Sequence, residues 1–338
     1  MLTTVIASLA LAAALQDAAP QENGAQQAMQ ASEPTLQLQG NQPQRDNALR
    51  ETASEYAAYH GVVADLRDAP IGSAADLDNA MDSLTAFYSE DRLVRAWIAY
   101  TAMIAAQHPE YLDDVRELAD YYGPDAAMSG LMYDPSYATS FENSADAQSS
   151  VVQAIETDTA TMREVSERYR NAAYELQSAR WANRRAGDRD ARLDAIQNAA
   201  ERHIAMDEAR LARVSARLDA GLPASELFVE DMPQQTPVAT PQLSLTVGET
   251  PVNPDRARIG RILSVAALED LSADPARSRE VIDALLSDPV VERCLAWVRL
   301  DLQQCVAAGH FKYEDSFCIA EHALLDVSRC IGASAASN

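Results

Sequence analysis

Residues 294–330 have the sequence CLAWVRLDLQQCVAAGHFKYEDSFCIAEHALLDVSRC and hold all four cysteines of the chain, Cys294, Cys305, Cys318 and Cys330. Apolar residues recur at three and four positions on both sides of Gly309, which is typical of amphipathic helices. Glycine commonly ends a helix. The stretch therefore predicts two helices, 289–308 and about 316–328, joined by a turn that begins at Gly309. We accordingly expect an all-α fold.

The cysteine spacing predicts how this hairpin is cross-linked. Cys294 and Cys305 are eleven residues apart on one helix, a rise of about 16 Å, whereas a disulfide needs Cα atoms within about 7 Å. The same argument excludes a bond between Cys318 and Cys330. Antiparallel helices then give the nested pairs Cys305–Cys318 and Cys294–Cys330.

Two alternatives to disulfides stay open at this point. One is a zinc site that adds His310 and His322 to the cysteines, although the close C-x2-C pairs of structural zinc sites are absent. The other is a set of four reduced thiols, which would require a cytosolic protein.

The same region resembles known proteins. The run from His310 to Cys318, followed by His322 and Cys330 and preceded by Gln303-Gln304-Cys305, is similar to the C-terminal segment of a family of exported α-helical proteins of α-proteobacteria for which no activity is known. The resemblance covers about residues 288–332 and is weaker around 97–137. It implies export and the four-cysteine pattern, and it implies no catalytic residue.

The N-terminus predicts export independently. Residues 2–15 carry no charge, and Ala12, Ala13 and Ala14 provide small residues for signal peptidase. We expect a signal peptide over residues 1–14, cleaved near Ala14, and a periplasmic protein without a transmembrane segment, because the apolar run is shorter than a bilayer requires. Residues 15–46 are rich in Gln, Ala, Asn and Pro and predict a disordered leader.

Helical periodicity continues through residues 47–221, for which we expect one helical domain. About five short helices are predicted as far as residue 141, separated at Pro70 and Gly72, Ser89, His108-Pro109 and Gly123-Pro124. Residues 144–220 contain no proline and only one glycine, Gly187, in a polar stretch. We expect a long, coiled-coil-like antiparallel hairpin that turns at Gly187, with a continuous rod as the alternative.

The remaining chain predicts a second body. Residues 222–254 contain repeated prolines and no positive charge, as is typical of an extended linker. Helices are predicted at 257–271, 275–286, 289–308 and about 316–328, and they form a four-cysteine domain over 255–332, followed by a short tail, 333–338.

The net charge of the chain limits the kinds of partner that it can bind. The chain of 338 residues has a net charge of -24, which argues against binding nucleic acid or an anionic bilayer through its overall field. Against this background, Arg180, Arg184, Arg185, Arg189 and Arg192 face only Asp188 and Asp190. We expect a basic hairpin tip. One hypothesis is a solvated tip whose arginines pair with neighbours on the helices. The other is a tip that binds an acidic partner, for which these five arginines are the candidate residues.

No catalytic, cofactor-binding or metal-binding constellation is predicted. The pairs His203–Asp207 and His322–Asp326 have helical i,i+4 spacing and are interpreted as ion pairs. The stretch His310 to Asp315 is a candidate recognition loop, and the alternative is that Phe311, Tyr313 and Phe317 only pack against the end of the hairpin. Gly130-Leu131-Met132 faintly resembles a lytic transglycosylase motif, but the upstream Glu117 lacks the following serine and Tyr133 stands at the glutamine position. The favoured hypothesis is a non-enzymatic periplasmic adaptor of the cell envelope, and the alternative is a cell-wall-active enzyme or its regulator.

Overall fold

The structure is a computed structural model that describes residues 45–89, 91–202, 204, 208–228, 254–271 and 275–332. These residues form helices joined by short turns, and none of them belongs to a β-strand. The predicted signal peptide, nearly all of the predicted leader, residues 229–253 of the predicted linker and the tail lie outside the described residues, as does the pair His203–Asp207. None of the described helices is both long and apolar enough to cross a membrane.

Five helices precede residue 134, as predicted: α1 (Arg45–Asp68), α2 (Ala74–Thr85), α3 (Arg92–Ala105), α4 (Pro109–Tyr122) and α5 (Pro124–Tyr133). Their ends follow local chemistry. Ser73 caps α2 in a reciprocal capping box with Asp76. Gly123 adopts a φ of 88° between α4 and α5, a conformation that favours glycine.

Helix α3 lies at the centre of the core. All its residues except Arg92 and Arg95 are buried, among them Trp97 and Tyr100. A helix that is apolar on every side must be surrounded by protein, and α3 packs against α1, α6 and α9.

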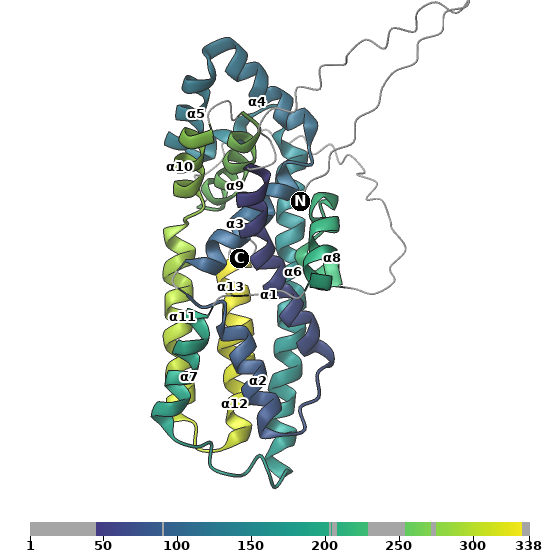
Figure 1. Cartoon of the computed structure of the whole chain (residues 1–338), viewed down its shortest axis with the longest axis vertical. Coiled ribbons are helices and arrows are strands. Elements are labelled where there is room, and N and C mark those ends of the chain that lie inside the picture. The colour runs from purple at the N-terminus through teal and green to yellow at the C-terminus, as the bar shows by residue number, and fades with distance from the viewer. Residues whose placement is uncertain are drawn as a thin grey trace, which may run out of the picture. The chain divides into compact units, whose positions relative to one another are not determined.

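The long hairpin predicted for residues 144–220 is not found. Helix α6 (Ser144–Glu175) is a single long helix with the expected buried face, which includes Ile155, Met162 and Tyr169. The chain does turn near Gly187, whose φ is 103°. Helix α7 (Arg189–Glu201), however, packs on α2 and α11, and α8 (Glu208–Arg217) packs on α1 (Figure 1). Periodicity correctly indicated the buried face of α6, but it does not say which neighbour covers that face.

The C-terminal helices lie close to their predicted positions. They are α9 (Pro254–Leu271), α10 (Pro275–Leu285), α11 (Pro289–Ala308), α12 (Lys312–Cys318), the π-helix η6 (Ile319–Asp326) and α13 (Val327–Gly332). Asp288 caps α11, where its carboxylate accepts hydrogen bonds from the amides of Val290 and Val291. The last helical stretch thus begins at Lys312 and contains a π-helix, which the sequence did not predict.

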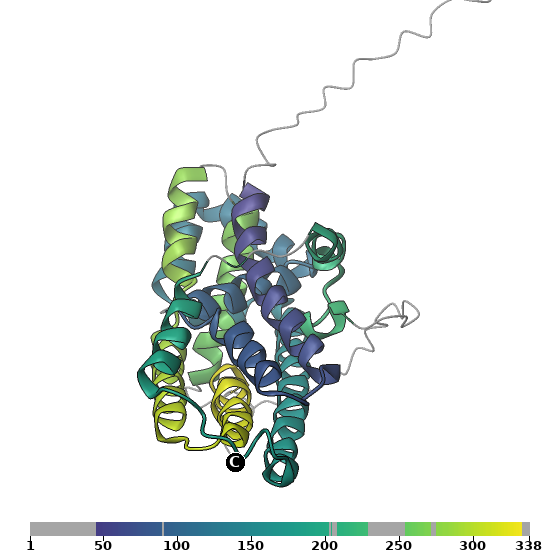
Figure 2. The same ribbon diagram turned by 60° about the horizontal axis from the view of Figure 1, so that its bottom comes forward.

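The prediction of two separate bodies is wrong. Helices on both sides of residues 229–253 share one hydrophobic core, and α12 and α13 lie beside α6 (Figures 1 and 2). The Tyr111 hydroxyl donates to the carbonyl of Leu263 (3.0 Å). A Cβ added to Gly260 of α9 would lie 2.0 Å from the carbonyl oxygen of Pro135, so the two segments approach backbone to backbone. A proline-rich stretch shows where helices stop, but it does not show whether the flanking helices pack together.

The predicted linker also begins too early. The 3-10 helices η4 (Leu218–Ala220) and η5 (Ala224–Phe228) precede residue 229, and Ala224 and Leu227 are fully buried. The buried carboxylate of Asp158 accepts hydrogen bonds from the amides of Ala224 (3.3 Å) and Ser225 (2.8 Å). It accepts from amides at the start of η5 that have no partner within the helix, so the chain stays packed as far as Phe228.

The four cysteines form the two nested disulfides. Cys294 pairs with Cys330 and Cys305 pairs with Cys318, with Cα–Cα distances of 5.6 and 5.7 Å. The bonds hold α11 antiparallel to the helical stretch 312–332, and they leave no cysteine for a zinc site.

Candidate functional site

The predicted arginine cluster spans the segment that connects α6 to α7 and the first turn of α7. This segment, residues 179–188, crosses one end of the helices and pairs with the loop after α11 (Figure 1). The amide of Ala186 donates to the carbonyl of His310 (3.0 Å), and the amide of Lys312 donates to the carbonyl of Arg184 (3.1 Å). Arg185 and Phe311 form an antiparallel bridge. The structure therefore joins two candidates that the sequence kept apart, the arginines and the 310–315 loop.

Four of the five arginines are exposed at this end. Arg180, Arg184 and Arg185 make no side-chain hydrogen bond or ion pair with any residue that the structure describes. Arg189 pairs with its neighbour Asp190 (2.8 Å) and is 65% exposed.

Arg192 departs from the prediction. Its guanidinium turns inward, where it pairs with Asp315 and donates to the carbonyl of Gly309 (3.3 Å). Its side chain is only 14% exposed. Because α7 packs on α11, the first turn of α7 faces the protein and Arg192 braces the loop, so it is not available to a partner.

A buried ionic cluster holds residues 310–315, which the sequence suggested as a loop but which comprise the end of the turn after α11 and the first turn of α12. Lys312, the sole lysine of the chain, pairs with Asp315 (2.7 Å) and with Asp78 of α2. Burial raises the pKa of the Asp315 carboxyl, while Lys312 and Arg192 oppose that shift. These ion pairs fix residues 310–315 to α2 and α7. Phe311 remains 39% exposed, and its ring stacks on that of Tyr313.

A cavity of about 390 Å³ lies beneath this loop, between α2, α7 and α11. Its carboxylates include Asp78, Asp82 and Asp188. Asp78 pairs with Lys312, Asp82 pairs with Arg202 (2.7 Å), and Asp188 caps α7 by accepting the amide of Ala191 (2.9 Å). Each carboxylate therefore has a structural partner.

The transglycosylase-like residues do not converge on this cavity. Leu131 is fully buried in the core, which gives this part of the motif a packing role, and Tyr133 is 92% exposed. Glu117 is exposed on α4. The enzyme alternative remains a prediction that these positions neither support nor exclude.

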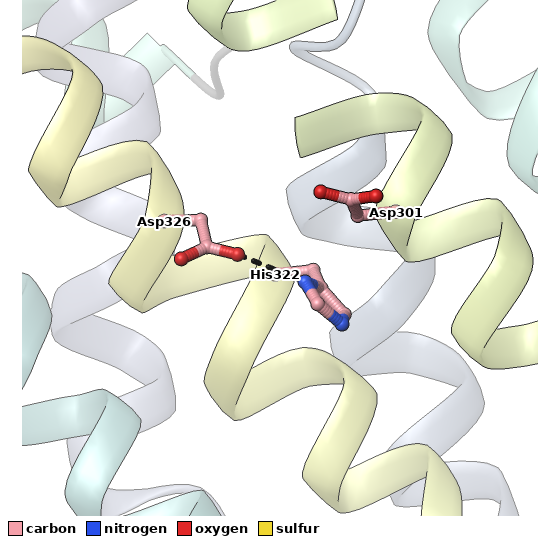
Figure 3. Close-up of side chains that lie close together, drawn as sticks. All are labelled: Asp301, His322 and Asp326. Carbon is pink, nitrogen blue, oxygen red and sulfur yellow. Dashed lines mark hydrogen bonds and ion pairs between the residues drawn. The ribbon is translucent and has the colours of Figure 1, made fainter. Parts of the chain in front are cut away.

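A second cluster joins α11 to the π-helix. Asp301 projects from α11 toward His322 and Asp326 of η6, and the possible ligand atoms of the three residues all lie within 4.8 Å of one another (Figure 3). The Nδ1 of His322 lies 2.9 Å from Oδ2 of Asp326, and Arg329 donates to the other oxygen of Asp326 (2.8 Å). The sequence showed the His322–Asp326 pair but missed Asp301.

A register argument could have found Asp301. Asp301 lies four residues before Cys305, and His322 lies four residues after Cys318. Since Cys305 and Cys318 are bonded across antiparallel helices, residues at equal distances from them face each other. The missing signal was thus present in the predicted disulfide pairing.

The chain matches no protein-family model, no curated protein and no solved structure. The resemblance of residues 288–332 to exported α-proteobacterial proteins therefore stays a prediction, and the function must be argued from the residues alone.

Proposed function

We propose that this protein is a non-enzymatic adaptor or scaffold of the periplasm that binds an acidic segment of another envelope protein. The binding site is the surface formed by Arg180, Arg184, Arg185, Arg189 and Phe311, called here the arginine surface. The observation that carries the proposal is the antiparallel pairing of residues 182–186 with 310–313. It places Arg184 and Arg185, whose exposed side chains have no partner among the described residues, on a stretch of backbone beside the exposed Phe311.

The chemistry of these side chains suits carboxylates. A guanidinium can donate two parallel hydrogen bonds to one carboxylate, which gives direction as well as attraction. Phe311 adds an apolar anchor of the kind enriched at the centre of interfaces. The rest of the chain is strongly acidic, so an acidic partner is repelled elsewhere and oriented toward this end.

The surface is also pre-organised. Lys312 and Arg192 fix the loop from inside through Asp78 and Asp315, and the backbone pairing fixes the arginine segment. A rigid site loses less conformational entropy on binding. Export is supported by the two disulfides, because such bonds persist in oxidising compartments.

The proposal predicts salt-sensitive binding of an acidic probe. A fluorescein-labelled polyglutamate peptide should bind the native protein, and its affinity should fall as salt is added, because exposed charges are screened. In an Arg180→Glu/Arg184→Glu/Arg185→Glu variant the affinity should fall by about tenfold or more, because attraction becomes repulsion. Fluorescence anisotropy measures both effects.

The matched control is Arg163→Glu/Arg213→Glu/Arg293→Glu, which reverses three exposed arginines on α6, α8 and α11. It changes the net charge by the same amount, so it should retain the native affinity within about threefold if the site is local. Equal losses in both variants would show that only overall charge matters and would refute the arginine surface.

A further inference from the structure

We propose that Asp301, His322 and Asp326 bind one divalent transition-metal ion of the Zn²⁺ type. The cluster shares no residue with the arginine surface, so this proposal does not depend on the proposed function. Three observations carry it: the spacing of the donor atoms, an unpaired carboxylate, and a framework that is covalently fixed on both sides.

The donor atoms are spaced as the ligands of one ion are. Zinc binds histidine nitrogen and carboxylate oxygen at about 2.0–2.2 Å, so two of its ligands lie about 3–4 Å apart. The Nδ1 of His322 and Oδ2 of Asp326 are 2.9 Å apart, and all three donors lie within 4.8 Å of one another. The limit of 4.8 Å is wider than this spacing, so binding requires the three donors to move closer together.

The two carboxylates of the cluster would be stabilised by a bound cation. Asp301 makes no hydrogen bond or ion pair within the part of the chain that the structure describes, yet its carboxylate is partly buried and close to that of Asp326. Two carboxylates at such a separation repel each other. Arg329 contacts only the outer oxygen of Asp326 and is itself 64% exposed, so it does not lie between the two carboxylates.

The framework around the cluster is rigid. The disulfides Cys294–Cys330 and Cys305–Cys318 join the two ligand-bearing helices on either side of the cluster. The π-helix is fixed at two of its carbonyls: Ala320 accepts the hydroxyl of Ser166, and Ala323 accepts the hydroxyl of Tyr88, each at 2.8 Å. π-Helical turns occur frequently at functional sites, and fixed helices hold ligands more accurately than loops do.

The donor set selects the class of ion. One imidazole with two carboxylates suits Zn²⁺ and its neighbours in the first transition row, whereas Ca²⁺ requires six to eight oxygens. The His322 and Asp326 side chains are 22% and 21% exposed, which leaves room for water to complete the coordination.

The test uses the full chain with its disulfides intact and Zn²⁺ alone as the probe. Isothermal titration calorimetry should show one ion bound per chain. Asp301→Asn and His322→Gln should each weaken Zn²⁺ binding by about tenfold or more, since each replaces a preferred zinc ligand, a carboxylate or an imidazole, by a neutral amide of similar size. Far-UV circular dichroism confirms that the variants are folded.

Asp120→Asn and His310→Ala are the matched controls, because both residues are exposed and lie outside the cluster; each should leave the affinity unchanged. Ca²⁺ at the same concentration should not displace Zn²⁺. The proposal is overturned if the native protein binds no Zn²⁺, if either cluster variant binds it as tightly as the native protein, or if Ca²⁺ competes equally.

Discussion

Asp158 and His60 form a buried polar pair between α6 and α1. Asp158 caps η5, and the Nε2 of His60 lies 3.9 Å from its Oδ2, with both side chains at most 1% exposed. Burial lowers the pKa of His60, and the nearby Asp158 opposes that shift. The histidine ring contacts the rings of Tyr56 and Tyr59, with centroids 4.6 and 5.5 Å away. His60 is therefore held in an environment that disfavours its charged form.

The lowered pKa of His60 predicts a pH dependence of stability. The unfolded chain takes up a proton below about pH 6.5, whereas folded His60 stays neutral until its lower pKa is reached. In that interval the unfolded state binds more protons, so the free energy of unfolding falls as the pH falls, by up to about 1.4 kcal/mol per pH unit. Urea unfolding between pH 7.5 and 5, at about half-unit steps, measures this slope.

His60→Phe should reduce that slope, because it replaces the imidazole by a ring without a titrating group. His310→Ala is the control, since His310 is exposed, and it should keep the native slope. If His60→Phe shows the full native slope, the neutral, buried state of His60 is not what makes stability depend on pH.

Among single residues, the cysteine pairs could be predicted from the sequence because covalent geometry restricts them. The rise of a helix and the reach of a disulfide were enough to predict the nested pairs. Asp158 and Lys312 could not be placed in this way, because a charged residue is expected at the surface and is buried here only through partners distant in sequence, such as the amide of Ser225 and the carboxylate of Asp78.

At the element scale, α9 approaches the segment η2 (Pro135–Ser140) at Gly260. The position tolerates no side chain, because an added Cβ would lie 2.0 Å from the oxygen of Pro135 and 2.9 Å from the Cα of Ser136. Nearby, Arg116 of α4 makes two hydrogen bonds of 2.7 and 2.6 Å to Asp270 at the end of α9. The packing of α9 on η2 and α4 is thus one of the contacts that join the N-terminal helices to the C-terminal helices.

Gly260→Ala should lower the free energy of unfolding by about 1–3 kcal/mol, because backbone atoms must move apart to admit the methyl group. Chemical denaturation followed by circular dichroism measures the change. Gly130→Ala, also within a helix, is the control. Its added Cβ would meet only Tyr137 at 3.9 Å, so stability should stay equal or rise by up to about 1 kcal/mol. A harmless Gly260→Ala would contradict the close packing of α9 on η2.

Helix positions were largely predictable, and their partners were not. Capping residues, prolines and glycines mark helix ends locally, as Asp288 and Gly309 do for α11. The partner of α7 depends instead on contacts such as that between Arg192 and Asp315, whose residues are more than one hundred positions apart. Leu211 is exposed for the same reason. Periodicity placed it on the buried face of a predicted hairpin, but it could not show that α8 packs on a different neighbour.

In the whole molecule, the arginine surface contrasts with a chain whose net charge is -24. The described residues before residue 229 and after residue 253 share one hydrophobic core, so the arginine surface does not lie on a separate arm. The sequence proposed the arginines and the stretch around Phe311 as separate candidates. The fold brings residues 184–186 and 310–312 together and turns Arg192 inward.

The most direct test of this account is site-specific photo-crosslinking in the cell that makes the protein. A photoreactive amino acid replaces Arg185 in one variant and the exposed Arg163 of α6 in another. The account predicts an adduct with a discrete envelope protein from position 185, lost when Arg180 and Arg184 are also changed to glutamate, and no such adduct from position 163. No adduct from position 185, or the same adducts from both positions, would contradict it.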